Sequence, residues 1–237
     1  MVKDCYSDDK SVCQDWPKRG KLKENIDMSL NELKGIITDN EVVYSYVLTT
    51  IDLQDGFFIQ KGSAPNFQGG LITLCTCKHF MRTYRSPLDW KNIWIAGFTS
   101  VNTTKDHLNY LFYIMRIKNA SQSYKELWDW LDDSVRRAKN ARYNKCGDVY
   151  EPKPGIKHEF NPKNYFEPIK NHVHRKNNEW HCDIDYLNNR TGKRPALLVG
   201  DPSFSFLWSQ PKIYFKNKHP RTKKSNVRDF VQSLESK

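Results

Sequence analysis

The chain has 237 residues, and its 38 Lys and Arg outnumber its 27 Asp and Glu to give a formal net charge of +11. Hydrophobic residues make up 38% and aromatic residues 13% of the sequence, which supplies a core and excludes a disordered chain. No stretch approaches the ~18 apolar residues of a membrane span, and no apolar run follows Met1, so we expect a cytoplasmic protein without a secretion signal. The cationic surplus favours a polyanionic partner, although a solvated surface or a lysine-rich codon bias would give the same count.

The first half of the chain predicts mainly strands. Residues 1–40 are polar and mixed in charge, and we expect an appendage with one short helix over 29–36. Residues 42–48 form a β-branched and aromatic run typical of a buried strand, and the Gly- and Pro-rich stretch 52–70 predicts a long irregular loop. Further strands are expected over 71–77, 92–98 and 109–117, the last two joined as a hairpin by a turn at 99–108.

The second half begins with a predicted helix. Ser123 is its N-cap, Glu126 is the partner in a capping box, and apolar residues at helical spacing continue to about Ala141. The following stretch, 146–180, is loop-rich and basic. We then expect a last strand over 196–200, a basic tail over 216–237 and a short helix near the end of the chain.

These elements predict a single α+β domain over 41–215, with a central amphipathic helix and a mixed or mostly antiparallel sheet or small barrel. Strands do not alternate regularly with helices, and the sequence contains neither GxGxxG nor a Walker loop. An enzyme built on a glycine-rich dinucleotide loop or a P-loop is therefore excluded.

The six cysteines show no zinc-binding pattern. Without a secretion signal, free thiols are favoured over disulfides. Two of the cysteines are separated by one residue, which is the alternation of a strand and not the CxxC of a zinc knuckle. The positions are Cys5, Cys13, Cys75, Cys77, Cys146 and Cys182.

One stretch resembles the signature of a known family. The run Ala64-Pro65-Asn66-Phe67-x-Gly69-Gly70-x-x-Thr73-Leu74-x-x-Cys77-Lys78, followed by Arg82, is similar to the nucleotide-modification-associated domain, type 2. Four further pieces lie in the order of that family, so the resemblance covers about residues 42–208. They are Tyr44-Ser45-Tyr46-Val47, Asp89-Trp90 before Ile93-Trp94-Ile95-Ala96-Gly97, Tyr113-x-Met115-Arg116, and Cys146-Gly147-Asp148-x-Tyr150-Glu151-Pro152.

This resemblance implies an association with systems that modify or police unusual bases in nucleic acid, often in conflicts with phage. The strand pattern is also similar to the PUA-like barrels that read modified bases. The chain departs from the family where residues 58–63 separate Gly56-Phe57 from Ala64, and where His79 follows Lys78 instead of the common proline. The closing strand motif, 197–206, is poorer in Tyr than is usual, and residues 1–40 and the basic tail have no counterpart. These departures bear on the substrate more than on the fold.

The family motif contains the first candidate site. A lysine point charge and an arginine fork suit a phosphate or a base edge, and Lys78 and Arg82 follow the expected strand. Backbone N–H groups of the glycine-rich loop add donors for a phosphate cradle, whereas the alternative is a solvated turn. The predicted ligand-binding residues are Asn66, Gly69 and Gly70 in that loop, Tyr46 as a stacking ring and Arg116 from its own motif.

General acid–base chemistry needs carboxylates or imidazoles on loops. Asp148 is the carboxylate that we select, with a turn cap as the equal alternative, and His174 is the imidazole. With Lys78 and Arg82, these residues form the predicted catalytic set. Other aromatic residues could also stack a base, but most must belong to the core: Tyr44, Trp90, Trp94 and Trp128.

A metal site is the weaker hypothesis. His172 and His174 place two imidazoles on one face of an extended segment, with Cys182 and Asp183 nearby in the sequence. The spacing matches no closed zinc pattern, so we predict no metal, and the sequence indicates no particular cofactor. Cys77 is a nucleophile only if a neighbour lowers the pKa of its thiol, since buried strand cysteines are usually inert.

Two functions fit these observations. The first is a protein, possibly an enzyme, that acts on a modified nucleotide or nucleic acid in base modification or phage defence. The second is a non-catalytic reader that binds an extruded modified base. Either way, the expected partner is a nucleic acid or nucleotide and not a membrane. A reader needs aromatic walls and cations, whereas an enzyme also needs carboxylate or imidazole chemistry in the same pocket.

Overall fold

The computed structural model of the chain describes residues 14–37, 41–169 and 180–237. The chain divides into two compact units, each assembled from stretches that are far apart in the sequence. The single domain expected over 41–215 contributes residues to both. Unit 1 comprises residues 1–16, 61–90 and 119–199, and unit 2 comprises residues 17–60, 91–118 and 200–237.

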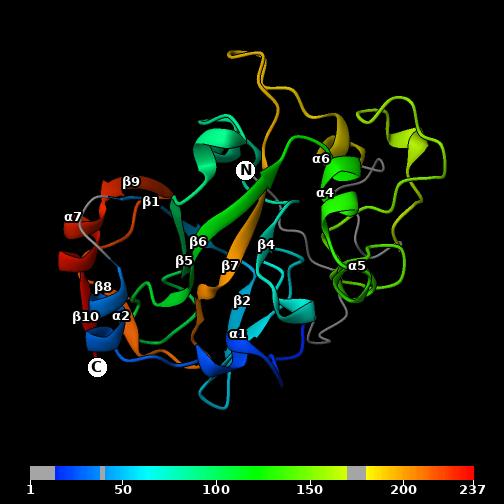
Figure 1. The fold of residues 1–237 in the computed structure, drawn as a ribbon. Helices are drawn as coiled ribbons and strands as arrows, with labels where there is room; N and C mark the ends of the chain where they lie inside the picture. The colour runs from blue at the N-terminus through cyan, green and yellow to red at the C-terminus, as the bar shows by residue number, and fades with distance from the viewer. Residues whose placement is uncertain (1–13, 38–40, 170–179) are drawn as a thin grey trace. The chain divides into compact units, whose positions relative to one another are not determined.

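Unit 2 contains most of a mixed β-sheet. Its strand β1 (Val42–Leu48) runs parallel to β5 (Trp94–Thr99) and antiparallel to β9 (Thr222–Asn226), where the strand order ends (Figure 1). β5 and β6 (Leu111–Ser121) form the expected antiparallel hairpin, and β7 (Leu197–Leu207) follows β6 in the strand order. The β-branched and aromatic residues of these strands suit a pleated, buried surface.

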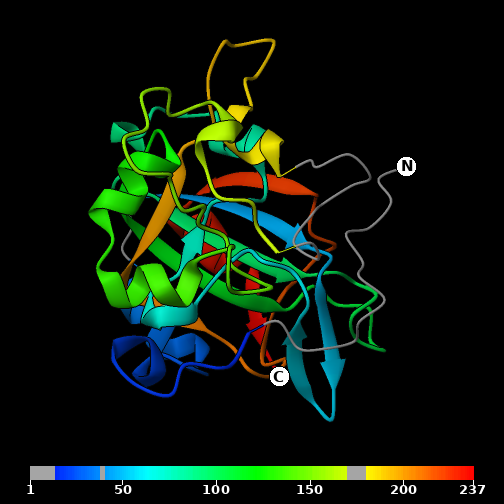
Figure 2. The same ribbon diagram turned by 90° about the vertical axis from the view of Figure 1, so that its right-hand side faces the viewer.

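A second hairpin occupies part of the loop expected over 52–70. β2 (Ile51–Gln54) and β3 (Phe57–Gln60) pair antiparallel across Asp55 and Gly56, whose φ angles are 52° and 82° (Figure 2). The loop prediction is wrong here because an Asp-Gly pair between two short apolar runs is itself a hairpin signal.

The expected N-terminal appendage contributes to the core of unit 2. After the short α1 (Lys21–Glu24), α2 (Leu30–Ile36) begins at a reciprocal capping box between Ser29 and Glu32. Its Leu33 is fully buried in a core cluster that also contains residues of β1, β5 and β6.

The expected basic tail is likewise part of unit 2. β8 (Ile213–Phe215) pairs antiparallel with β10 (Leu234–Ser236), and β9 is a strand of the main sheet. The helix predicted near the end of the chain is α7 (Val227–Gln232), which buries Phe230 in the same core cluster as α2.

Unit 1 contains the short strand β4 (Thr73–Leu74), which pairs antiparallel with Leu198 and Val199 at the start of β7. The strand expected over 71–77 is limited to these two residues, because the chain then turns into α3 (His79–Arg82). The helix α6 (His181–Asp185) belongs to the same unit. Short 3₁₀ turns lie at Gln68–Gly70, Leu88–Trp90 and Pro162–Asn164.

Two short helices stand where one helix was expected from Ser123 to Ala141 (Figure 1). Ser123 caps α4 (Tyr124–Trp130) as predicted, but Asp132 is the N-cap of a separate helix, α5 (Asp133–Lys139). Aspartate favours N-cap positions over helix interiors, so the chain ends one helix and starts another at this point.

The described residues therefore confirm an α+β fold with a mostly antiparallel sheet. No closed barrel is detected among them, so the PUA-like alternative is not confirmed. In the same residues, no helix combines the length and the apolar character needed to cross a membrane.

Candidate active site

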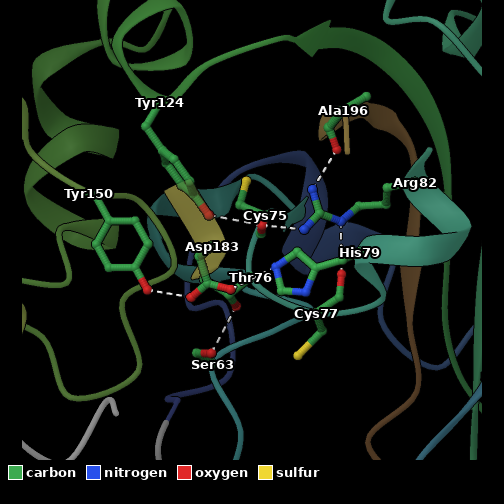
Figure 3. Close-up of polar contacts among 10 residues, drawn as sticks. All are labelled: Ser63, Cys75, Thr76, Cys77, His79, Arg82, Tyr124, Tyr150, Asp183 and Ala196. Carbon is green, nitrogen blue, oxygen red and sulfur yellow. Dashed lines mark hydrogen bonds and ion pairs between the residues drawn. The ribbon is translucent and has the colours of Figure 1, made fainter. Parts of the chain in front are cut away.

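A buried arginine holds the turn that follows β4. Arg82 is fully buried, and its guanidinium donates to three backbone carbonyls (Figure 3). Nε donates to Cys77 O at 2.8 Å, Nη1 to Ala196 O at 2.6 Å and Nη2 to Cys75 O at 2.5 Å. Because the guanidinium is a rigid fork, these bonds fix the turn against the start of β7. The backbone of Lys78 in that turn has the left-handed conformation, with φ of 58°, and α3 begins directly after it.

His79, the first residue of α3, lies against a buried carboxylate from α6. Its Nε2 is 2.8 Å from Oδ1 of Asp183, which is an ion-pair distance when the imidazole is protonated. The side chain of Asp183 is 1% exposed, whereas that of His79 is 23% exposed. The carboxylate is therefore shielded from water while part of the imidazole remains accessible.

Tyr150 binds the second oxygen of the same carboxylate. Its hydroxyl donates to Oδ2 of Asp183 at 2.5 Å, so that Asp183 lies between Tyr150 and His79 (Figure 3). Burial, together with the nearby Asp183 charge, raises the pKa of Tyr150 well above its ordinary value. The hydroxyl therefore remains a donor at neutral pH.

The chain after α6 packs along α3 and restricts the imidazole. The ring of Tyr186 stacks on that of His79, with centroids 4.9 Å apart and planes 15° apart. Next to it, Asn188 Nδ2 donates to Thr83 Oγ1 at 3.0 Å, and both residues are buried. We define His79, Asp183, Tyr150 and Tyr186 as the histidine site. A partly exposed histidine oriented by a buried carboxylate is an arrangement that general acids and bases use in enzymes.

Unit 1 also contains a fully buried polar cluster, which we define as Asn66, Thr73, Lys139 and Asp148. Lys139 Nζ donates to Asn66 Oδ1 at 2.8 Å and to Asn66 O at 2.9 Å. Thr73 Oγ1 donates to the two oxygens of Asp148 at 3.0 and 2.9 Å. Burial raises the pKa of Asp148 and lowers that of Lys139, while the attraction between the two charges opposes both shifts.

The predicted residues Asn66 and Asp148 are thus brought together, but with no exposed surface. Their side chains bind other parts of unit 1, including the Cys146 carbonyl, which accepts from Asn66 Nδ2 at 2.6 Å. Two predicted glycines differ in their surroundings. A Cβ at Gly69, where φ is 70°, would lie 3.2 Å from Ala138 Cβ of α5, whereas Gly70 has open space around it. Gly69 therefore permits close packing on α5.

The remaining predicted residues lie in different places. Lys78 is partly exposed and directly precedes α3. Arg82 is the last residue of α3, and its guanidinium donates to the three backbone carbonyls described above. Tyr46 and Arg116 belong to unit 2. Tyr46 is fully buried with its hydroxyl 2.8 Å from that of Tyr113, and the Arg116 guanidinium lies 3.4 Å from the centre of the Phe204 ring.

Some predictions fall outside the described residues or are corrected by them. His172 and His174 lie outside these residues, so a catalytic role for His174 stays a prediction. Where the chain is described, no three His, Cys, Asp or Glu side chains are grouped closely enough to hold a metal. Cys146 is half of a disulfide, so the prediction of free thiols is wrong for this residue. The thiols of Cys75, Cys77 and Cys182 are not part of a disulfide.

The sequence motifs did not indicate His79 and Asp183 as a pair. In the sequence, His79 stood out only as a departure from the family motif, and Asp183 only as a candidate metal ligand. The available signal was a histidine, instead of the common proline, directly beside the most specific motif. The roles of Tyr150 and Lys139 depend on burial, which neither residue type nor spacing revealed.

The buried cluster predicts a pH-dependent loss of stability in Lys139→Met. The variant leaves the Asp148 carboxylate without its cation, so we expect urea denaturation at pH 7 to show a loss of about 3 kcal/mol. Without that cation, the pKa of Asp148 in the folded state rises further above its unfolded value. The stability that this group contributes is present at acid pH and is lost as the pH rises. The loss in the variant should therefore shrink towards pH 5.

The control for this experiment lies on the same helix. Arg137 is exposed on α5, so Arg137→Met should change the free energy of unfolding by less than about 0.5 kcal/mol. A Lys139→Met variant with the same stability loss at pH 5 and pH 7 would contradict the assignment of Lys139 as the partner of Asp148.

Unit 2 carries an exposed cationic surface around its edge strand, β9. Exposed lysines on an edge strand can serve to prevent pairing with other chains, and they also attract polyanions. Lys223 of this strand lies 5.0 Å from the centre of the Phe215 ring. We define the basic edge as the exposed residues Lys216, Lys218, Arg221, Lys224 and Arg228.

Comparison of the chain with protein-family models, with curated proteins and with solved structures finds no match. The resemblance to the nucleotide-modification-associated domain therefore rests on the motif residues alone.

Proposed function

We propose that this protein is an enzyme that acts on a nucleotide or on a modified base in nucleic acid, with His79 as its general acid or base. The observation that carries the proposal is the contact between His79 Nε2 and the buried Asp183 Oδ1 at 2.8 Å. The carboxylate is buried, while the imidazole keeps an accessible surface. Asp183 orients the ring and stabilises its protonated form during proton transfer.

Charge and motif support an anionic, nucleotide-like substrate. The net charge is +11, and the partly exposed Lys78 directly precedes His79. A lysine at this position provides a point charge for a phosphate beside the proton-transferring group. The main run of the resemblance to nucleotide-modification-associated domains, Ala64 to Lys78, ends directly before His79. A role in base modification or phage defence is therefore part of the proposal.

Mass spectrometry of nucleotide pools and of DNA incubated with the protein tests this proposal, since it requires no assumption about the reaction. We expect the loss of at least one nucleotide or base, with a product of defined mass. Binding of nucleic acid without any conversion would contradict an enzymatic function and favour a non-catalytic protein that reads a modified base. Incubation with Cys77→Ser in parallel shows whether the thiol takes part.

The basic edge predicts salt-dependent binding of DNA. Each phosphate contact contributes about −0.9 to the slope of log affinity against log salt concentration. We expect Lys218→Glu/Arg221→Glu/Lys224→Glu to reduce that slope by about 2 to 3 and to weaken binding at low salt, as measured by fluorescence anisotropy.

A control variant with the same change of net charge distinguishes phosphate binding at the basic edge from attraction of DNA by the net charge of the whole protein. Lys91, Arg137 and Lys157 are exposed outside the basic edge, so their triple replacement by Glu changes the net charge equally. Equal weakening by both triple variants, or a slope of zero in the unmodified protein, would contradict a phosphate-binding role of the basic edge.

A further inference from the structure

Two aromatic side chains are exposed at the helix that carries His79. Phe80 is 50% exposed and Tyr84 is 43% exposed, and their rings meet edge to face with centroids 5.3 Å apart. The residues are four positions apart, Phe80 in α3 and Tyr84 in the turn that continues it, so they lie on the same side. We define them as the aromatic pair.

The aromatic pair contrasts with the rings that the sequence suggested for stacking. Tyr44, Tyr46, Trp90 and Trp94 are at most 3% exposed and belong to the core. An exposed phenyl ring leaves apolar surface in water at a cost in free energy, and several such rings together mark an interaction site. Leu88, four residues after Tyr84 in the sequence, is 89% exposed.

Cationic residues flank the aromatic pair on both sides in the sequence. Lys78 precedes it and Arg85 follows it, both partly exposed. Arg85 Nη1 contacts Asp89 O at 3.4 Å, while the Asp89 carboxylate accepts from Ser86 Oγ at 2.6 Å. Rings between cations are the combination that single-stranded nucleic acid recognises, because bases stack on the rings and phosphates bind the cations. A purely apolar partner would gain nothing from these charges.

We propose that the aromatic pair stacks an unpaired base of a single-stranded nucleic acid, with Lys78 and Arg85 contacting the phosphates on either side of it. The proposal rests on the proposed function, since it gives the histidine site a polynucleotide substrate instead of a free nucleotide. Phe80 directly follows His79 in α3, so the aromatic pair and the histidine site share one short helix. An unpaired base also presents both faces without the cost of opening a duplex.

The test compares two ligands with the same backbone charge. Fluorescence anisotropy measures binding of the protein to a labelled oligothymidylate of twelve nucleotides and to an abasic oligonucleotide of equal length. Stacking of one base contributes enough to change an affinity about 10- to 100-fold. We expect the unmodified protein to bind oligothymidylate tighter than the abasic strand by this factor, and Phe80→Ala/Tyr84→Ala to lose the difference.

Matched variants separate stacking from general effects. Phe80→Trp/Tyr84→Phe retains two rings and should preserve the preference for bases. Tyr143 is 66% exposed elsewhere in unit 1, so Tyr143→Ala should leave both affinities unchanged. Circular dichroism spectra and melting temperatures check that the variants remain folded, as expected for residues with so much exposed surface.

The outcomes distinguish this inference from the proposed function. An equal loss of affinity for both ligands in Phe80→Ala/Tyr84→Ala, or no loss at all, overturns the aromatic pair as a base-stacking site even if mass spectrometry finds a reaction. A selective loss on oligothymidylate supports the site even if no nucleotide is converted, and the protein is then a reader. Loss of the preference in Tyr143→Ala overturns the assignment to Phe80 and Tyr84.

Discussion

Replacement of His79 by Gln is expected to lower kcat about 100- to 10,000-fold in the reaction that mass spectrometry identifies. This is the range over which a positioned acid or base contributes to catalysis. Gln retains a polar side chain of similar reach but cannot transfer a proton. Because binding of the substrate does not depend on proton transfer, KM should change much less than kcat.

Asp183→Asn should reproduce most of that loss without removing the imidazole. The amide keeps the shape of the carboxylate but not the charge that stabilises a protonated ring 2.8 Å away. Asp183 is a positioning residue in this account, so its variant should lower kcat and leave KM nearly unchanged. Tyr150→Phe removes the bond to the second oxygen and should give a smaller effect in the same direction.

Two measurements distinguish catalysis from structural support. Added imidazole should restore part of the activity of His79→Gly, since a free imidazole can occupy the vacated space and transfer the proton. His158 is an exposed histidine in the same unit, and His158→Gln should retain full activity. If His79→Gln keeps more than a tenth of the kcat of the unmodified protein, His79 is not the general acid or base.

Local patterns in the sequence predicted those elements that depend on local physics. The run 42–48 forms β1 with the expected bounds, and Ser29 and Ser123 cap helices. The errors arose where one signal outweighed another. Gly and Pro content hid the Asp55-Gly56 hairpin, and apolar spacing through Leu131 hid the second N-cap at Asp132. The division into two units was not predictable, because each is assembled from three separate stretches.

Long-range contacts limited what could be predicted of the site. Residue types suited to a functional site also suit a buried network, so Asn66 was assigned to ligand binding and Asp148 to catalysis although both are fully buried. Only the fold brings α6 to α3, and with it Asp183 to His79. The motif directed attention to the turn that precedes His79 but assigned the chemistry to Lys78 and Arg82. The sequence does not reveal how deeply each side chain is buried. Burial decides whether a charged group can contact a ligand or instead pairs with groups of its own chain.

Arg82→Met should be among the most destabilising single substitutions in unit 1. It removes the donors of three hydrogen bonds at once, two of them buried. The carbonyls of Cys77 and Ala196 lose this partner, whereas the Cys75 carbonyl still accepts from the Tyr124 hydroxyl at 2.9 Å. Each unsatisfied buried group costs about 1–3 kcal/mol. We expect a total loss of about 5 kcal/mol in the free energy of unfolding, which is comparable to the whole stability of a marginal domain.

Urea denaturation measures this loss of stability, and two further variants are compared with Arg82→Met. Arg82→Lys keeps the charge and a single donor group without the fork, so we expect a folded protein with an intermediate loss. Arg85→Met removes the weaker contact of a partly exposed guanidinium to Asp89 O at 3.4 Å and should cost less than about 0.5 kcal/mol. If Arg82→Met instead unfolds at the same urea concentration as the unmodified protein and loses only ligand binding, Arg82 belongs to the ligand site. The three hydrogen bonds from Arg82 would then not be what stabilises the turn before His79, and other contacts would have to fix the orientation of the imidazole.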